Sequence, residues 1–248
     1  NKMIPNFLTI LAISAGMSAI RFGLEEQWEN AALAILAAAI LDALDGRVAR
    51  ILKGASKFGA ELDSLSDFIS FGVAPAMLLY LWAMQHFGPF GWMLTVLFSV
   101  SMALRLARFN TMLEVDSLPV WTSNFFAGVP APAAAGLVLM PMILSFIVGD
   151  NFFRSPFVIS FYLISVSALV VSSIPTFSFK KVKVPAKQVL PFMIISTALV
   201  AALVSAPWLT LSGVLIIYLI TIPISIRTYR KRKKEEPIPL MKTHNDSQ

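Results

Sequence analysis

The sequence predicts an all-α, polytopic integral membrane protein with about eight transmembrane helices. Three observations lead to this fold class. Of the 248 residues, 57% are hydrophobic and 14% are charged, whereas soluble domains carry about 25% charged residues. The apolar residues gather in runs that approach the ~20 residues needed to span a bilayer. Most basic residues fall between alternate runs, as they do at the cytoplasmic ends of membrane helices.

Eight apolar runs follow one another and fill nearly the whole chain. They are Phe7–Phe22, Ala31–Leu41, Phe68–Trp82, Trp92–Leu104, Ala127–Val148, Phe157–Ile174, Val189–Ser205 and Trp208–Ile226. The second run is short, and we expect it to continue as far as Leu52 with charge on one face, which is a functional signal inside a membrane. The loops are too short to bury a core of their own, so we expect one transmembrane domain over residues 1–226.

The basic residues predict the orientation. With eight spans, every Lys and Arg except Arg21 and Arg154 falls on one side of the membrane, and short cytoplasmic loops collect basic residues. Both termini are therefore expected in the cytoplasm. Residues 227–248 begin with the basic run Arg227–Lys234, and we expect a juxtamembrane anchor followed by a disordered tail. The net charge of +6 follows this topology, which argues against nucleic-acid binding.

Four aspartates form the candidate site. Asp42 and Asp45 are three residues apart, Asp63 and Asp67 are four apart, and each pair shares a helix face. We expect the two helix ends to meet as an antiparallel hairpin, so that four carboxylates converge near hydrocarbon. One or two Mg²⁺ or Mn²⁺ ions would compensate their charge. The alternative is that these acids are ordinary interfacial residues in salt bridges. With no cysteine in the chain, thiolate metal sites and cysteine nucleophiles are excluded.

Small residues and one arginine accompany the acids. Gly46, Ala49 and Gly59 leave room where another helix or a ligand approaches closely. Arg50 lies beyond the first acidic pair, where its planar guanidinium can hold a carboxylate or a phosphate. These residue types, in this order, point to a site that binds metal and phosphate together.

The pattern D-x2-D-G-x2-A-R-x8-G-x3-D-x3-D is complete from Asp42 to Asp67, and it resembles the signature of the CDP-alcohol phosphotransferases. The resemblance implies a helical membrane fold, usually a homodimer, with a polar cavity open to the cytoplasm. A CDP-linked donor and divalent metals bind there. It further implies that Asp42, Asp45 and Asp63 are metal ligands, and that Asp67 is a ligand that also acts as the general base.

The resemblance also implies a donor site. The residues that would bind CDP-diacylglycerol are Asn6, Thr9, Asp42, Gly46, Ala49, Arg50, Ser56 and Gly59. Asn6 and Thr9 belong to the segment PNFLT that opens the first span, where the family contacts its donor. A helix-capping role for Asn6 is the alternative.

Residues outside the shared motif bear on the acceptor. The stretches Ser56–Ala76, Arg105–Asn110 (RLARFN) and Phe126–Ala135 resemble the integral-membrane phosphatidylserine synthases of that family, in a longer bacterial form. This implies an enzyme of the bacterial inner membrane that transfers the phosphatidyl group of CDP-diacylglycerol to the hydroxyl of L-serine and releases CMP. The four aspartates alone also fit another acceptor, such as glycerol phosphate, inositol phosphate or choline, or an inactive scaffold. A divalent-cation transporter fits less well, because the outer half of the membrane shows no acidic pathway.

Arg105, Arg108 and Asn110 are the candidate acceptor or phosphate ligands. They fall at the cytoplasmic end of the fourth predicted span, where two guanidiniums and an amide can bind a phosphate or an amino-acid carboxylate. The alternative is that both arginines only anchor the helix end at the lipid headgroups.

Overall fold

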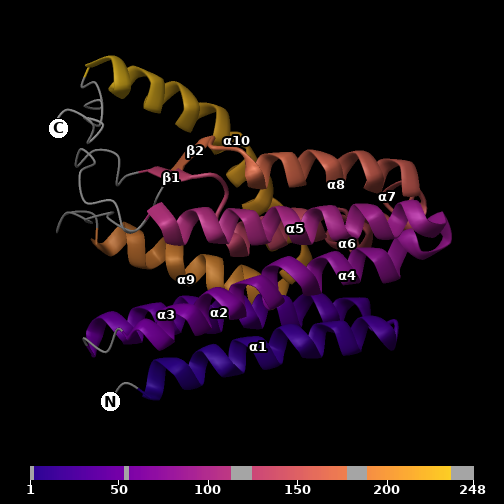
Figure 1. The fold of residues 1–248 in the computed structure, drawn as a ribbon, viewed down its shortest axis with the longest axis horizontal. Coiled ribbons are helices and arrows are strands. Elements are labelled where there is room, and N and C mark those ends of the chain that lie inside the picture. Colours follow the sequence, from indigo (N-terminus) through magenta and orange to yellow (C-terminus); the bar gives the residue numbers. More distant parts are fainter. Residues whose placement is uncertain (1–2, 53–55, 113–124, 178–188, 236–248) are drawn as a thin grey trace, which may run out of the picture.

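The protein is a bundle of helices whose long axes run side by side (Figure 1). The computed structural model describes residues 3–52, 56–112, 125–177 and 189–235. The first half contains α1 (Met3–Leu24), α2 (Trp28–Ile51), α3 (Lys57–Asp67), the π-helical η1 (Phe68–Val73), α4 (Ala74–Leu79), the π-helical η2 (Tyr80–Met84), the 3₁₀ turn η3 (Gln85–Phe87) and α5 (Gly88–Met112). The second half contains β1 (Phe125–Ala127), α6 (Ala131–Val148), α7 (Asp150–Phe153), α8 (Pro156–Val171), β2 (Pro175–Phe177), α9 (Val189–Ser205) and α10 (Pro207–Glu235).

The helical membrane class predicted from the sequence is confirmed. Among the described residues, four helical stretches are long and apolar enough to cross a membrane, namely Met3–Leu24, Lys57–Thr111, Ala131–Val148 and Pro207–Arg232. The third predicted span is longer than its apolar run, because the helix already begins at Lys57 and carries Asp63 and Asp67. The chain reverses at Gly88, whose positive φ of 58° suits glycine. The count of eight spans stays a prediction, since α8 and α9 are apolar but shorter.

Small residues let α1 approach the third span closely. The buried positions of α1 include Thr9, Ala12 and Gly16, which repeat every three or four residues on one helix face. Ser70 of η1 donates a hydrogen bond to the carbonyl oxygen of Ala12 at 3.1 Å, and Ser66 donates one to the carbonyl oxygen of Thr9 at 3.4 Å. Close backbone approach and hydroxyl hydrogen bonds are the usual means of holding membrane helices together.

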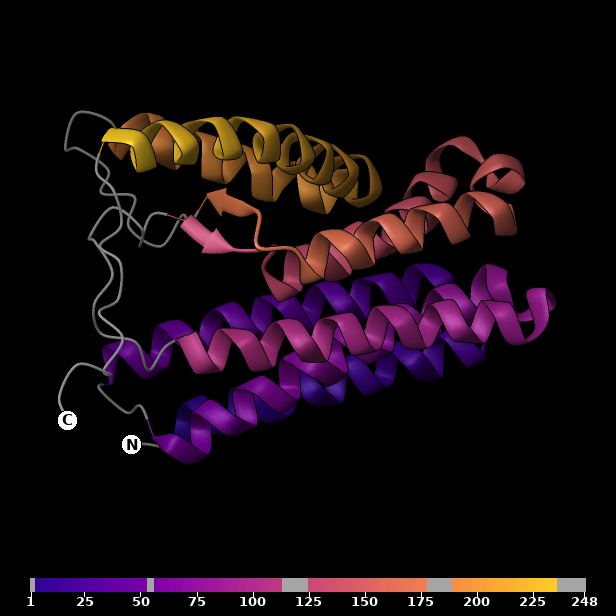
Figure 2. The ribbon, with the colours of Figure 1, turned by 45° about the horizontal axis from the view of Figure 1, so that its top comes forward.

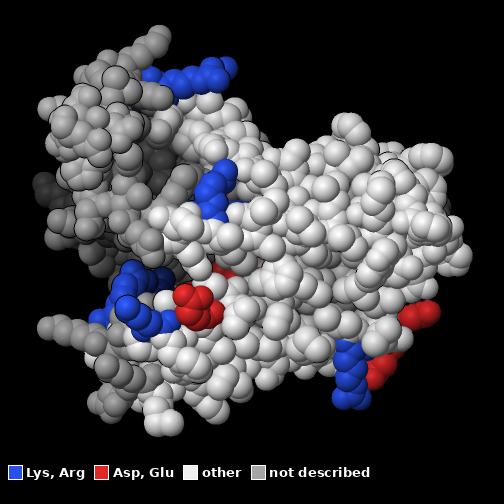
Figure 3. All heavy atoms as spheres, in the orientation of Figure 1, with Lys and Arg blue, Asp and Glu red and all other residues white. Residues whose placement is uncertain are grey.

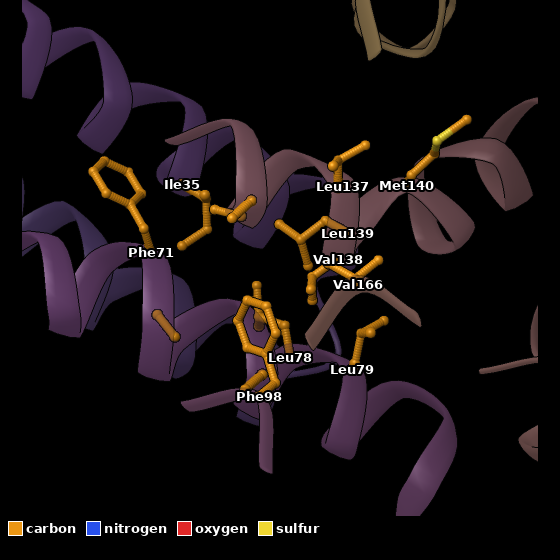
Figure 4. Packing of buried hydrophobic residues seen from close by; sticks show 14 of the residues in the cluster. Ile35, Phe71, Leu78, Leu79, Phe98, Leu137, Val138, Leu139, Met140 and Val166 are labelled. Atoms are coloured by element: carbon orange, nitrogen blue, oxygen red, sulfur yellow. The ribbon is translucent and has the colours of Figure 1, made fainter. Parts of the chain in front are cut away.

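The apolar core lies between α2, α4, α5, α6 and α8 (Figure 4). Leu78 and Leu79 of α4 and Phe98 of α5 are completely buried, and they face Val138 of α6 in this cluster. The helix α9 differs from the others, since it has no buried residue and packs mainly on α10. The core therefore fixes the first half of the chain to α6 and α8, while α9 borders the bundle.

A short antiparallel sheet, which the sequence analysis did not foresee, joins two distant segments. Residues 125–127 of β1 pair with residues 175–177 of β2. Ala127, the first residue of the predicted fifth span, therefore lies in a strand, and β2 begins directly after the predicted sixth span. Thr176 is 1% exposed and donates a hydrogen bond to the carbonyl oxygen of Gly128 at 2.7 Å. Figure 2 shows the two strands between α10 and one end of α5.

Charged side chains lie at the end of the bundle that carries the two chain termini. α1 begins and α10 ends at the same end of the bundle, on the left in Figure 1. Figure 3 shows acidic side chains beside a group of Lys and Arg side chains at that end. α10 continues through the basic run as far as Glu235, and the tail predicted for 236–248 lies outside the described residues. Lys2, Lys53 and the basic residues of 180–187, which were predicted on the cytoplasmic side, also lie outside the described residues.

We expect Gly16→Ala to destabilise the protein. A Cβ atom at Gly16 would lie 2.6 Å from Ser70 Oγ and 2.8 Å from Ser70 Cα, and the backbone atom cannot turn away. Overpacking of this kind costs about 1–3 kcal/mol, so the Tm in detergent should fall. Gly213→Ala in α10 is the matched control, because a Cβ there meets nothing within 4 Å. Its Tm should hold or rise slightly, since alanine favours helix. Equal Tm values for the two variants would contradict this account of the α1 packing.

Candidate functional site

The candidate site is built where the end of α2 meets the start of α3. α2 carries Asp42 and Asp45 in its last turns, and α3 carries Asp63 and Asp67. Ser56 caps α3, because its hydroxyl oxygen accepts a hydrogen bond from the backbone N–H of Gly59 at 3.0 Å. The π-helical η1 begins directly after Asp67, and such segments are frequent at functional sites.

Three of the four aspartates come together. Asp42, Asp63 and Asp67 each offer a carboxylate oxygen, and these oxygens lie within 4.8 Å of one another. We call these residues the three-carboxylate group. Asp67 Oδ1 is buried and has no hydrogen-bond partner. Like charges at this separation repel, and a buried acceptor without a partner is costly. A hard divalent cation would neutralise the carboxylate repulsion and also bind the unpaired Asp67 oxygen, since Mg²⁺ and Mn²⁺ prefer oxygen ligands.

Asp45 stands outside the three-carboxylate group. Its side chain is 5% exposed, and its Oδ2 accepts a hydrogen bond from the Thr9 hydroxyl at 2.8 Å. This contact joins α1 to α2 and places Asp45 on the wall of a pocket next to the group. A role of Asp45 as a metal ligand stays a prediction.

A pocket between α1, α2 and α3 adjoins the carboxylates. It brings together most of the residues that the sequence analysis assigned to the donor, and the lining consists of Pro5, Asn6, Thr9, Asp45, Gly46, Ala49, Ser56, Gly59, Ala60 and Asp63. A Cβ atom at Gly46 would meet nothing within 4 Å, whereas one at Gly59 would lie 2.9 Å from Asn6 Oδ1. Gly46 thus leaves open space in this α1–α3 pocket, and Gly59 lets Asn6 approach α3.

Two predicted donor residues lie outside the lining of the pocket. Arg50 turns back on its own helix, and its Nε donates a hydrogen bond to the carbonyl oxygen of Gly46 at 2.9 Å. Its side chain is exposed at the same end of the bundle. Asp42 belongs to the three-carboxylate group instead. The donor roles of both residues stay predictions.

The three predicted acceptor residues have different surroundings. Arg105 is 7% exposed, and its buried Nε has no hydrogen-bond partner. It interacts electrostatically with Asp67, so a buried cation faces the three-carboxylate group. Asn110 donates a hydrogen bond to Ser64 Oγ at 2.9 Å, which ties the end of α5 to α3. Arg105 and Asn110 therefore flank the acids from α5.

Arg108 is engaged with the end of α8. Its guanidinium donates hydrogen bonds to the carbonyl oxygens of Val171 and Ser172, both at 2.9 Å, and to Ser173 Oγ at 3.0 Å. It thereby satisfies carbonyl groups that a helix end leaves without partners. This arrangement matches neither the lipid anchor nor the free acceptor ligand considered from the sequence.

Two residues near these acids were not predicted from the sequence. Ser64 lies inside the motif between Asp63 and Asp67, and that position was the only signal for it. Tyr218 of α10 interacts electrostatically with Arg105, although more than 100 residues separate the two in the chain. A single tyrosine in an apolar span gives no local signal, so only the tertiary packing reveals its position.

Comparisons with known proteins agree with the motif. A family model described as CDP-alcohol phosphatidyltransferase matches residues 2–171, and one described as CDP-alcohol phosphatidyltransferase 2 matches residues 187–223. Similar proteins from three bacteria bear the name CDP-diacylglycerol--serine O-phosphatidyltransferase. The Mycobacterium tuberculosis protein is 40% identical over 92% of this chain and 80% of its own length. The Helicobacter pylori protein is 38% identical over 73% and 74%, and the Bacillus subtilis protein 36% over 72% and 92%.

We expect Asp63→Asn and Asp67→Asn each to weaken Mn²⁺ binding, because a neutral amide is a poorer ligand for a hard cation. The loss should be about tenfold or more, since even outer-shell partners contribute that much. Titration of the purified protein with Mn²⁺, followed by electron paramagnetic resonance, measures the affinity. Asp150→Asn is the control, as Asp150 pairs with Arg154 in a different part of the bundle. Wild-type Mn²⁺ affinity in both site variants would show that the three-carboxylate group does not bind the metal.

Proposed function

Because the chain belongs to the CDP-alcohol phosphatidyltransferase family, we propose that its three-carboxylate group and the α1–α3 pocket catalyse one phosphatidyl transfer. The phosphatidyl group of CDP-diacylglycerol passes to the hydroxyl of L-serine, and the products are phosphatidylserine and CMP. The relatives named for this reaction support serine as the acceptor, since the match to the mycobacterial protein covers 92% of the chain.

The position of Asp63 carries the proposal. Asp63 lines the α1–α3 pocket and also belongs to the three-carboxylate group. A donor whose nucleotide occupies the pocket therefore has its pyrophosphate beside the carboxylates. The open space at Gly46 and the amide of Asn6 suit this part of the donor. Arg50, exposed at the mouth of the same region, compensates phosphate charge.

The four aspartates have two roles in the proposed reaction, metal binding and proton acceptance. Asp42, Asp63 and Asp67 would hold a divalent ion, with Asp45 as a further ligand that the motif implies, and such an ion supplies Lewis-acid stabilisation of the leaving CMP phosphate. Asp67 accepts the proton of the serine hydroxyl as its oxygen attacks phosphorus and the bond to CMP breaks. The buried Asp67 Oδ1 without a partner is available for this proton.

Arg105 and Asn110 position the acceptor. The buried guanidinium of Arg105 faces Asp67, and serine brings a carboxylate that needs a cation. Asn110 holds the end of α5 against Ser64. Arg108 binds the end of α8. It therefore contributes to the acceptor site indirectly, by holding α8 against α5. Positioning and charge compensation supply most of the rate gain in phosphoryl transfer.

The chain is a membrane protein, and we propose that it resides in the bacterial inner membrane with the site and both termini in the cytoplasm. The described basic residues support this orientation, since Arg47, Arg50 and Lys57 flank the carboxylates. Arg21, in the last turn of α1, and Arg154, directly after α7, lie toward the opposite end of the bundle (Figure 1). A homodimer remains part of the proposal through the family resemblance alone.

An acceptor panel tests the proposed reaction. Purified protein with CDP-diacylglycerol and Mn²⁺ or Mg²⁺ should release CMP with L-serine, and much less with glycerol phosphate, inositol phosphate or choline. Excess chelator should stop the release, and added metal should restore it. Faster CMP release with another acceptor would support phosphatidyl transfer but contradict serine as the acceptor. Full turnover in chelator would contradict the metal-dependent mechanism.

We expect Gly46→Ala to impair donor binding without unfolding the protein. The added methyl group meets no protein atom within 4 Å but projects into the α1–α3 pocket that Gly46 lines. The KM for CDP-diacylglycerol should rise severalfold, while the KM for serine and the Tm stay near the wild-type values. Gly213→Ala serves again as the control. An unchanged donor KM would place the nucleotide outside this pocket.

We expect Arg105→Ala to raise the KM for serine. A hydrogen bond to a charged group contributes about 1.5–3 kcal/mol, so the rise should be tenfold or more. Arg105→Lys should restore only part of the loss, because an ammonium group lacks the planar fork of arginine. Arg21→Ala, which removes an exposed ion pair with Glu25 at the other end of α1, should leave both KM values unchanged. Normal serine KM in folded Arg105→Ala protein would remove Arg105 from the acceptor site.

A further inference from the structure

Three buried polar atoms around the acceptor side of the site lack hydrogen-bond partners. They are Asp67 Oδ1 on α3, Arg105 Nε on α5 and the Tyr218 hydroxyl on α10. Buried polar atoms in folded proteins almost always have partners. Here the three belong to neighbouring side chains, since Arg105 interacts electrostatically with both Asp67 and Tyr218. A polar ligand between them would supply the missing partners.

Tyr218 is held in place by α6 and β2. α10 packs against both elements, and its contact with α6 is close, because a Cβ atom at Gly136 would lie 2.9 Å from Leu215 Cδ2. Leu215 is one helical turn before Tyr218, so this contact limits any movement of the tyrosine.

The β2 strand completes the surroundings of the tyrosine hydroxyl. Thr176 is near enough to the Tyr218 hydroxyl to interact with it, but the two hydroxyls do not reach hydrogen-bond geometry. The Thr176 hydroxyl instead donates its proton to the carbonyl oxygen of Gly128 at 2.7 Å. Since no acceptor within hydrogen-bond distance takes the proton of Tyr218, that O–H remains available to a ligand next to Arg105.

We propose that Tyr218 is an acceptor-specificity residue whose hydroxyl, together with the Arg105 guanidinium, binds the carboxylate of the amino-acid acceptor. This inference rests on the proposed function. A carboxylate has two oxygens and accepts a hydrogen bond from each donor. The acceptor's own hydroxyl is then directed at Asp67. An acceptor without a carboxylate leaves both buried donors unsatisfied, which is an effective means of rejection.

The consequence for the fold is that the last helix takes part in substrate selection. Tyr218 lies 151 positions beyond Asp67, the last residue of the motif. It falls within residues 187–223, which the second family model matches, and not within residues 2–171, which contain the motif. The motif then recognises the donor and activates the hydroxyl, while α10 recognises the acceptor.

Tyr218→Phe tests the assignment, because phenylalanine keeps the ring and removes only the hydroxyl. The KM for serine should rise about tenfold, as expected for the loss of a hydrogen bond to a charged group, while the KM for CDP-diacylglycerol and the Tm change little. Tyr162→Phe is the matched control, since the Tyr162 hydroxyl donates to the carbonyl oxygen of Leu137 at 2.8 Å. That variant should lose Tm and keep the serine KM. Tyr218→Met, which also lacks the hydroxyl, should reproduce the kinetic shift independently.

Serinamide as the acceptor shows which group the hydroxyl recognises, because its neutral amide replaces the carboxylate. Wild-type protein should use serinamide with a much higher KM than serine, and Tyr218→Phe should raise the serinamide KM no further. An equal rise for both acceptors, or an unchanged serine KM in the two Tyr218 variants, would overturn the inference. A wild-type protein that releases no CMP with serine would refute the proposed function instead, so the two failures are distinct.

Discussion

The close approach of three carboxylates at one end of the bundle is the constraint on which the rest of the structure depends. Asp42, Asp63 and Asp67 offer oxygens within 4.8 Å of one another. Such an arrangement is unfavourable without a cation. The packing of other helices must therefore hold the ends of α2 and α3 together. α1 contacts both sides of the site. The Thr9 hydroxyl donates a hydrogen bond to Asp45 of α2 at 2.8 Å, and the Ser70 hydroxyl, just after α3, donates one to the α1 backbone at 3.1 Å.

The same helix contacts also divide the site into two parts. On the proposed donor side, Gly46 leaves open space in the α1–α3 pocket, and Gly59 lets Asn6 approach α3 closely. The proposed acceptor side lies at α5 and α10, where Arg105 interacts electrostatically with both Asp67 and Tyr218. Arg108 stabilises this closure, because it binds the end of α8 just before β2 begins. In the proposed function, donor and acceptor approach the carboxylates from different elements, as an in-line displacement at phosphorus requires.

Sequence reasoning was successful where the signal is local. Apolar runs predicted the helical membrane class, and the spacing of the aspartates predicted that α2 and α3 would share a site. Contacts between side chains on different helices could not be predicted from the sequence. The pairing of Asp45 with Thr9, the capping of α8 by Arg108 and the position of Tyr218 all join segments that are far apart in the chain. The β1–β2 sheet was missed for a similar reason, since its two strands of three residues lie at the ends of long apolar runs.

The central claim is that the three-carboxylate group holds the divalent ion at which the donor pyrophosphate is bound. The most direct measurement is anomalous diffraction at the manganese edge from crystals of the protein with Mn²⁺ and CDP-diacylglycerol. The account predicts an anomalous peak among Asp42, Asp63 and Asp67, with the nucleotide in the pocket that Gly46 and Asn6 line. Manganese bound elsewhere, or a nucleotide bound with no metal at these carboxylates, would contradict it.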